Sequence, residues 1–203
     1  MARPRFVIVA GPNGCGKSTV GGARAKGELG ADVMNVDLID ADYAKAHPAW
    51  PREATNLLAA VEAERRVWKE LARGKSVAIE TVLSTDKYLD AIDAANRGGY
   101  ETIMYYVTVD SPQTAVQRIK ARVAMGGHHV PESKVRDRWI RSHRIAAEAF
   151  SRVGRATGFD NSGAEPVAVA LSEGGVAVWT PEGEGRAGAL RASLVARGLI
   201  ASR

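Results

Sequence analysis

The sequence has little of what secreted and membrane-spanning proteins need. Its 203 residues include one cysteine, so no internal disulfide can form, which favours a reducing compartment. No apolar run approaches the roughly 20 residues that cross a bilayer, and we find no separate apolar region of a secretion signal. Internal repeats and low-complexity linkers are also missing. These absences predict a single cytoplasmic domain over residues 1–203 with no membrane partner.

Signatures of several function classes are missing as well. We find no Leu-Ser-Gly-Gly-Gln-like stretch and no strand that ends in paired Asp-Glu, which disfavours a transporter-type ATPase. His128 and His129 have no cysteine or Glu-x-x-His partner, so we expect no zinc site.

Aromatic residues are scarce, at 6% of the chain, and this affects how the basic residues are interpreted. Residues 118–155 contain ten Lys or Arg and three Asp or Glu, a net charge of +7 compared with +5 for the whole chain. This segment lacks the interleaved aromatics on which single-stranded nucleic acid stacks. We therefore expect it to neutralise a nucleotide and a second anionic substrate, and we expect no nucleic acid partner.

The strongest positive signal is a glycine-rich stretch that follows the apolar run 6–10. Its spacing, Gly-x-x-x-x-Gly-Lys-Ser, is that of a phosphate-binding loop, in which backbone N–H groups and the start of a helix surround phosphates. We expect Lys17 to reach the terminal phosphates and Ser18 to hold Mg²⁺. A turn that binds no ligand is the alternative. The predicted nucleotide-binding residues are Gly11, Pro12, Asn13, Gly14, Cys15, Gly16, Lys17, Ser18 and Thr19.

Strand-like runs alternate with segments of helical spacing, which is typical of a mostly parallel sheet with helices on both faces. The predicted fold is an α/β three-layer sandwich of the P-loop NTPase type. Strands are predicted at 6–10, 32–37, 75–80 and 101–109. Helices are predicted at 17–28, 52–73, 85–97, 112–125 and 131–153. Turns are predicted within 38–51 and at 159–163, and a hairpin at 166–180 and a short helix at 187–196 complete the chain.

Acidic residues at two predicted strand ends are candidates for chemistry, because ligands collect at the carboxyl ends of parallel strands. Glu80, at the end of the third strand, suits the acid that organises Mg²⁺. Asp37, at the end of the second strand, could accept the proton of a hydroxyl that is phosphorylated. Asp40 or Asp42 could take that role instead. Asp37 could also simply cap the next element, and Glu80 could lack any metal contact.

Basic residues on two consecutive predicted helices suggest a lid. Arg118 and Arg122 are four residues apart and share a helix face, and Lys134, Arg138 and Arg141 are similarly spaced on the next helix. The glycines between the helices suit a mobile lid that brings guanidinium groups over a transferring phosphate. A solvated basic helix face is the alternative.

Seven separated stretches resemble the zeta toxin-like P-loop kinases, particularly their shorter bacterial branch. They occur in family order and cover about residues 5–163, leaving the predicted hairpin and terminal helix uncovered. The stretches are G-P-N-G-C-G-K-S, N-V-D-L-I, A-I-E-T, G-G-Y, R-I-K-A-R-V-A-M-G-G-H-H-V-P, R-D-R-W-I-R-S and F-D-N-S-G.

The resemblance implies an ATP-dependent kinase that phosphorylates the 3'-hydroxyl of UDP-N-acetylglucosamine, with an antitoxin protein as a partner. By position, Asp37 corresponds to the catalytic base of the family. Lys17 and Ser18 match the residues for ATP and Mg²⁺, and Arg118 or Arg122 matches the first lid arginine.

One departure from the family concerns the second lid arginine, which family members place just before the lid proline. Here the residues before Pro131 are Gly-His-His-Val. Arg138 or Arg141 would substitute from the next helix, or the phosphate is held less tightly.

These observations together predict a kinase for a small anionic acceptor. Its rivals are a kinase for another metabolite or an antibiotic hydroxyl, and a non-catalytic ATP-binding regulatory protein. The predicted catalytic residues are Asp37, Lys17, Arg118, Arg122 and Arg138. The predicted substrate-binding residues are Asp37, Glu80, Thr81 and Arg141, and the predicted metal ligands are Ser18 and Glu80.

Overall fold

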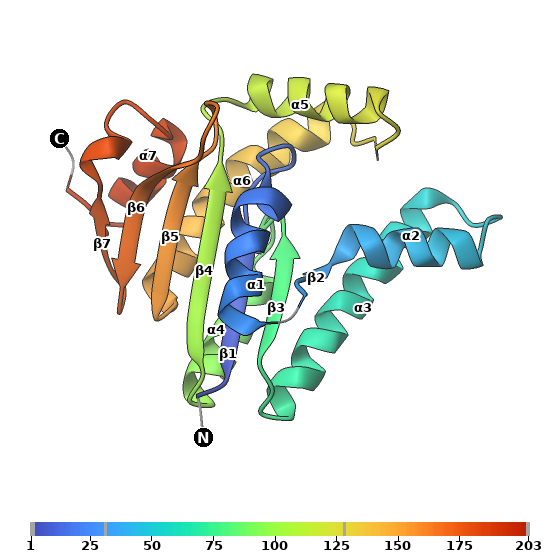
Figure 1. Ribbon diagram of the computed structural model, residues 1–203, viewed down its shortest axis with the longest axis horizontal. Helices are drawn as coiled ribbons and strands as arrows, with labels where there is room; N and C mark the ends of the chain where they lie inside the picture. The colour runs from blue at the N-terminus through green and yellow to red at the C-terminus, as the bar shows by residue number, and fades with distance from the viewer. Residues whose placement is uncertain (1–2, 31, 128, 202–203) are drawn as a thin grey trace.

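A seven-stranded sheet forms the centre of the part of the molecule that the structure describes, in the order β2-β3-β1-β4-β5-β6-β7 (Figure 1). The structure, a computed structural model, describes residues 3–30, 32–127 and 129–201. The first five strands are parallel, and β6 and β7 are antiparallel. The strands are β1 (Arg5–Ala10), β2 (Met34–Asn35), β3 (Val77–Thr81), β4 (Glu101–Thr108), β5 (Arg155–Asp160), β6 (Val167–Glu173) and β7 (Val176–Trp179).

Helices cover both faces of this sheet, which confirms the predicted three-layer α/β sandwich. Val7 and Val9 of β1 face a core that includes residues of η1, α1 and α5, whereas Phe6 and Ile8 face a core with residues of α3, α4, α6 and α7. Alternate residues of a strand point to opposite faces, so a central strand that is apolar throughout serves both cores. The helical elements are the π-helical turn η1 (Ser18–Gly22), α1 (Ala23–Leu29), α2 (Val36–Ala46), α3 (Arg52–Ala72), α4 (Lys87–Arg97), α5 (Pro112–Ala124), α6 (Glu132–Arg152), the 3₁₀ turn η2 (Pro181–Gly183) and α7 (Gly188–Ala196).

Among these helices, none has a stretch both long enough and apolar enough to cross a membrane within the described residues.

The predicted second strand and the turn after it are wrong in extent. Strand β2 has only two residues, and α2 begins at Val36 and runs through most of the segment predicted to turn. The Asn35 side chain accepts a hydrogen bond from the Asp37 N–H at 2.8 Å and caps the helix. A capping Asn therefore starts a helix where the apolar pattern suggested more strand. Helices α2 and α3 pack against each other as a hairpin on the β3 side of the sheet (Figure 1).

Strand β5 is missing from the predicted elements. It pairs in parallel with β4 and antiparallel with β6, and so joins the C-terminal hairpin to the main sheet. Its sequence, R-A-T-G-F-D, has one large apolar residue. Gly158 is needed there because a Cβ would lie 2.9 Å from Leu190 Cδ2 of α7. A strand packed this closely needs small residues and gives a weak apolar signal. The predicted hairpin and terminal helix are confirmed as β6, β7 and α7.

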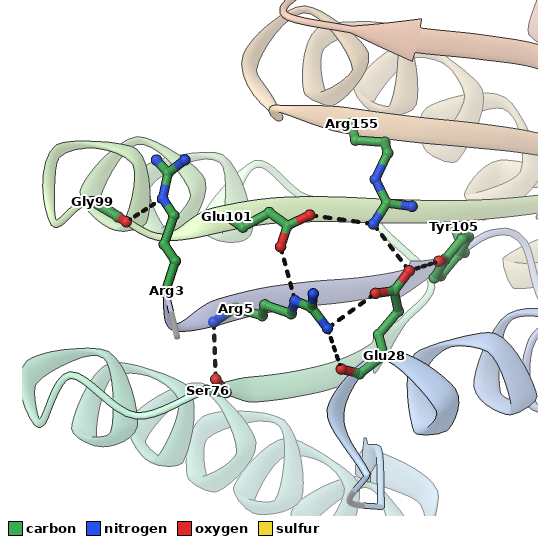
Figure 2. A network of polar contacts seen from close by, with 8 residues as sticks. All are labelled: Arg3, Arg5, Glu28, Ser76, Gly99, Glu101, Tyr105 and Arg155. Carbon is green, nitrogen blue, oxygen red and sulfur yellow. Dashed lines mark hydrogen bonds and ion pairs between the residues drawn. The ribbon is translucent and has the colours of Figure 1, made fainter. Parts of the chain in front are cut away.

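At the amino-terminal ends of the central strands, charged residues join β1, β4 and β5 to the end of α1 (Figure 2). Arg5 pairs with Glu101 at 2.8 Å and with Glu28 at 3.3 Å, and Arg155 pairs with Glu28 at 3.0 Å. The Tyr105 hydroxyl donates to Glu28 at 2.7 Å. This hydrogen bond and the two arginines lower the pKa of Glu28. The network fixes the far end of the helix that begins at the phosphate-binding loop.

Candidate functional site

The glycine-rich loop follows β1 and packs closely on β4 and α5. Gly11 has φ +146°, and a Cβ on it would lie 1.9 Å from the Val107 carbonyl oxygen. A Cβ on Gly14, φ +78°, would lie 2.5 Å from the Ala115 carbonyl oxygen. Only glycine fits both the backbone conformation and the space at these positions. The loop therefore has the close backbone path that a phosphate-binding nest requires.

Lys17 lies at the end of this loop with its side chain turned back over it. Its residue is 9% exposed, and Nζ donates to the Pro12 carbonyl oxygen at 3.1 Å. The ammonium group is thereby held above the loop. Cys15 belongs to the loop and its side chain is buried, and this burial raises the pKa of its thiol. The cysteine is therefore suited to packing and not to nucleophilic chemistry.

Asn161, just after β5, supports the loop from the other side and was not predicted as a site residue. Its Nδ2 donates to the Cys15 carbonyl oxygen at 2.9 Å, and its N–H donates to the Thr108 carbonyl oxygen at 2.8 Å. A Cβ on Gly16 would lie 2.4 Å from Asn161 Nδ2. The stretch F-D-N-S-G was assigned to a turn and is one of the stretches that resemble the family, but no role was predicted for Asn161, because its contact with the loop depends on where β5 ends.

Ser18 and Glu80 meet directly. The Ser18 hydroxyl donates to Glu80 Oε2 at 2.7 Å. In the sheet, Glu80 of β3 lies opposite Val9 of β1 and Asn35 of β2. No group of three or more His, Cys, Asp or Glu side chains with metal-site geometry occurs among the described residues. A hydroxyl with one carboxylate nevertheless fits Mg²⁺, which keeps waters and substrate phosphates as its other ligands.

Asp37 lies in the first turn of α2 and not at the end of a strand as predicted. Asn35, two residues earlier, is paired with Glu80 across β2 and β3, so the start of α2 follows directly on the strand beside Glu80. Asp37 and Glu80 line the same cleft, which is about 800 Å³ in volume. Of the two alternative bases, Asp40 is buried and Asp42 is exposed, and neither lines this cleft.

The cleft brings together most of the predicted site residues. Arg118 and Arg141 do not line it; Arg118 Nη2 donates instead to the Ser162 carbonyl oxygen at 3.4 Å. The predicted residues that do line it are Asn13, Gly14, Lys17, Ser18, Asp37, Glu80, Thr81, Arg122 and Arg138.

The lid residues come from the end of α5 and the start of α6. Arg122 of α5 and Lys134 and Arg138 of α6 line the cleft, together with His129 between the two helices. His128 lies outside the described residues. Burial lowers the pKa of Arg138, the positive charge of Arg141 lowers it further, and the carboxylate of Asp37 opposes both. Arg138 and Asp37 both line the cleft.

Buried polar contacts that the sequence did not reveal hold α6 in place. Ser142 donates to the Val82 carbonyl oxygen at 2.7 Å, so the Tyr106 hydroxyl, 3.1 Å away, donates to Ser142. His143 Nδ1 donates to the Trp139 carbonyl oxygen at 2.7 Å, and Nε2 therefore accepts from the Thr108 hydroxyl at 2.8 Å.

Burial lowers the pKa of His143 to about 4, which keeps its ring neutral and suited to this acceptor role. The contacts tie α6 to β4 and to the segment after β3. They leave Arg138, one turn earlier on α6, directed at the cleft.

A family model described as zeta toxin matches residues 1–169. The chain belongs to the zeta toxin family. A protein of *Haemophilus influenzae*, described as uncharacterized, is 26% identical over 141 residues, which is 66% of this chain and 92% of that protein.

Solved structures share the fold of this zeta toxin family member. The AvrRxo1-ORF1:-ORF2 structure with ATP matches with a TM-score of 0.71 at 15% identity, over 90% of this chain. The chain spans 62% of the length of that matched chain. The PezAT toxin-antitoxin system of *Streptococcus pneumoniae* matches with a TM-score of 0.59 at 16% identity, over 82% of this chain and 72% of that one.

Proposed function

We propose that this protein is an ATP-dependent kinase that transfers the γ-phosphoryl group to a hydroxyl of a small anionic acceptor, with the 3'-hydroxyl of UDP-N-acetylglucosamine as the first candidate. The observation that carries the proposal is the cleft. Residues of the candidate phosphate loop, Asp37 and the cations Arg122, Lys134 and Arg138 line one volume of about 800 Å³, which supports the proposal. That volume suits a nucleotide and a small acceptor together.

In this proposal Asp37 accepts the proton of the acceptor hydroxyl as it attacks. Lys17, held over the loop through Pro12, binds the terminal phosphates, while Arg122 and Arg138 stabilise the charge that develops on the transferring group. The loop backbone supplies N–H donors to the phosphates. Ser18 and Glu80 would hold Mg²⁺, which supplies charge neutralisation between the phosphates.

The presence of Arg138 and Asp37 on the walls of one cleft favours this proposal over a non-catalytic ATP-binding regulator. A regulator needs a phosphate loop but has no use for a carboxylate and a guanidinium on the acceptor side of it. In the family pattern the second lid arginine precedes the lid proline, and we propose that Arg138 substitutes for it here. Arg141, which is exposed, is the weaker candidate.

The proposal also includes a cytoplasmic location, where ATP is available, and a protein partner of the antitoxin type. One matched structure is described as a toxin-antitoxin system, and another as AvrRxo1-ORF1:-ORF2 with ATP.

The kinase proposal is tested by incubating the protein with ATP, Mg²⁺ and a panel of hydroxyl compounds, followed by mass spectrometry. The panel contains UDP-N-acetylglucosamine, other nucleotide sugars, sugar phosphates and hydroxyl-bearing antibiotics. A phosphate added to UDP-N-acetylglucosamine is the expected result. Phosphate added only to another compound of the panel would support the kinase proposal with a different acceptor. Stabilisation by ATP with no phosphorylated product from any member would instead favour the regulator.

A further inference from the structure

The start of α3 contributes a wall of the cleft that the proposed chemistry does not use. Arg52, Glu53, Asn56, Leu57 and Ala60 line this wall, and their spacing places them on one helix face. Polar side chains come first and apolar ones follow one to two turns later. The wall therefore suits a molecule with a charged or polar end and a less polar body.

Arg52 is held on this wall by a buried carboxylate. Its Nη2 donates to Asp40 Oδ2 at 2.8 Å, and the side chains of Arg52 and Asp40 are 50% and 3% exposed. Asp40 follows Asp37 by three residues on α2. The two carboxylates therefore occupy neighbouring positions on the helix, Asp37 at the cleft and Asp40 buried against α3.

The burial of Asp40 needs a reason. Removing a carboxylate from water costs free energy that one ion pair does not fully offset, and Asp40 Oδ1 accepts no hydrogen bond from any described residue. Apolar packing would join α2 to α3 at lower cost. What the buried charge adds is orientation, because it holds the guanidinium of a side chain that is half exposed and lines the cleft. Oriented guanidinium groups recognise the paired oxygens of phosphates and carboxylates.

The other cationic side chains that line the cleft come from other elements, and most already have a role in the proposed chemistry. Lys17, Arg122, Lys134 and Arg138 come from the phosphate loop and the lid. Lys87 of α4 pairs with Glu64 at 3.4 Å. Arg52 is thus the cation that α3 places at the cleft next to the helix carrying Asp37.

We infer that Arg52, positioned by Asp40, is the subsite for the anionic group of the acceptor. The acceptor is accordingly a hydroxyl compound that carries a phosphate, diphosphate or carboxylate. This inference rests on the proposed function for the identity of Asp37 as the base. In this account Arg52 contacts the acceptor, and Asp40 is a positioning residue that acts through Arg52.

The experiment measures binding by titration calorimetry, with the phosphate loop first saturated by Mg²⁺ and a non-hydrolysable ATP analogue. The probes are N-acetylglucosamine, its 1-phosphate, glucuronate and UDP-N-acetylglucosamine, which separate neutral, phosphate, carboxylate and diphosphate groups. The variants are Arg52→Gln, Arg52→Lys and Asp40→Asn. Arg65→Gln is the control, since Arg65 is on the same helix and pairs with Glu62 away from the cleft.

Wild type and the control are expected to bind at least one anionic probe about tenfold or more tightly than the neutral sugar. Arg52→Gln removes that preference and leaves the affinity for the ATP analogue within about twofold of wild type. Asp40→Asn reduces the preference severalfold, and Arg52→Lys retains part of it. If Arg52→Gln also loses nucleotide binding, Arg52→Lys, which keeps the charge, decides the question. Partial retention of the preference for anionic probes in Arg52→Lys supports the inference, and the full wild-type preference overturns it.

The inference is overturned if the Arg52 variants keep the wild-type preference for anions, or if wild type binds none of the anionic probes. A phosphotransfer assay run alongside separates this result from the kinase proposal. Arg52-dependent anion binding with no transfer would end the kinase proposal and leave the subsite standing. Phosphotransfer by Arg52→Gln with an unchanged KM for the acceptor would support the kinase proposal and overturn the Arg52 subsite.

Discussion

At the scale of single residues, the pair formed by Ser18 and Glu80 carries the magnesium assignment. The 2.7 Å contact between them brings together two side-chain oxygen atoms that would suit a hydrated Mg²⁺. Replacing Glu80 with Gln keeps the size of the side chain and removes its charge. We expect the Mg²⁺ concentration that gives half-maximal ATP binding to rise about tenfold, measured by calorimetry at several Mg²⁺ concentrations.

Glu173→Gln is a matched control for this variant, because Glu173 lies exposed on β6 away from the cleft. An unchanged Mg²⁺ dependence in Glu80→Gln would remove Glu80 from the metal site.

The sequence singled out the residues of the candidate phosphate loop because their proposed roles depend on neighbours in the chain. Lys17 and Ser18 are fixed by a spacing of eight residues. Asn161 and Arg52 were missed because their partners, Cys15 and Asp40, are reached only through the fold. Asp37 was chosen as a strand-end acid, yet it lies in a helix. It comes to the cleft only because β2 is short and the helix begins at once.

At the scale of elements, α6 is the part that must be held rigid for Arg138 to stay at the cleft. Ser142 and His143 fasten it through buried hydrogen bonds to Val82 and Thr108. Ser142→Ala leaves the Val82 carbonyl and the Tyr106 hydroxyl without this partner. We expect the free energy of unfolding to fall by about 1–3 kcal/mol and phosphotransfer to slow severalfold under conditions where the variant stays folded.

Chemical denaturation and initial rates provide these two readouts. Ser133→Ala, on the exposed first turn of the same helix, should change neither. If Ser142→Ala lost stability but kept the wild-type rate, α6 would be anchored without positioning the lid.

The elements that the sequence predicted well are those with a strong apolar pattern. β1 and β4 are apolar on both faces, and α3 and α6 each extend over 21 residues with long amphipathic repeats. The element that was missed, β5, is recognisable only from its partners. The residues at its centre, Ala156, Thr157 and Gly158, are small. Helix α7 and strand β6 pack closely on Gly158, and a short segment cannot show that packing.

At the scale of the whole molecule, charged groups at the amino-terminal ends of the strands make stability depend on pH (Figure 2). A hydrogen bond from Tyr105, with Arg155 and Arg5, lowers the pKa of Glu28, and Arg5 with Arg155 lowers the pKa of Glu101. A lowered carboxyl pKa stabilises the fold above the unfolded pKa of about 4.3, and this stability is lost as the pH falls through the folded pKa.

We therefore expect the free energy of unfolding to fall as the pH drops from about 5 to 3, and Glu28→Gln to flatten this dependence. At pH 7 the variant should be less stable by about 1–3 kcal/mol. Urea unfolding at a series of pH values measures both effects. A variant whose curve stays parallel to that of wild type would show that Glu28 does not contribute to acid sensitivity.

The central claim is that one cleft joins a bound nucleotide to a base that activates an acceptor hydroxyl, and Asp37→Asn tests it most directly. The measurement is single-turnover phosphotransfer from ATP to the acceptor found in the panel, with ATP affinity determined on the same preparations. Asp90→Asn, an exposed change on α4, serves as the control. The account predicts a rate lower by about 10²- to 10⁴-fold in Asp37→Asn, with ATP affinity unchanged. A rate within a few-fold of wild type would contradict it.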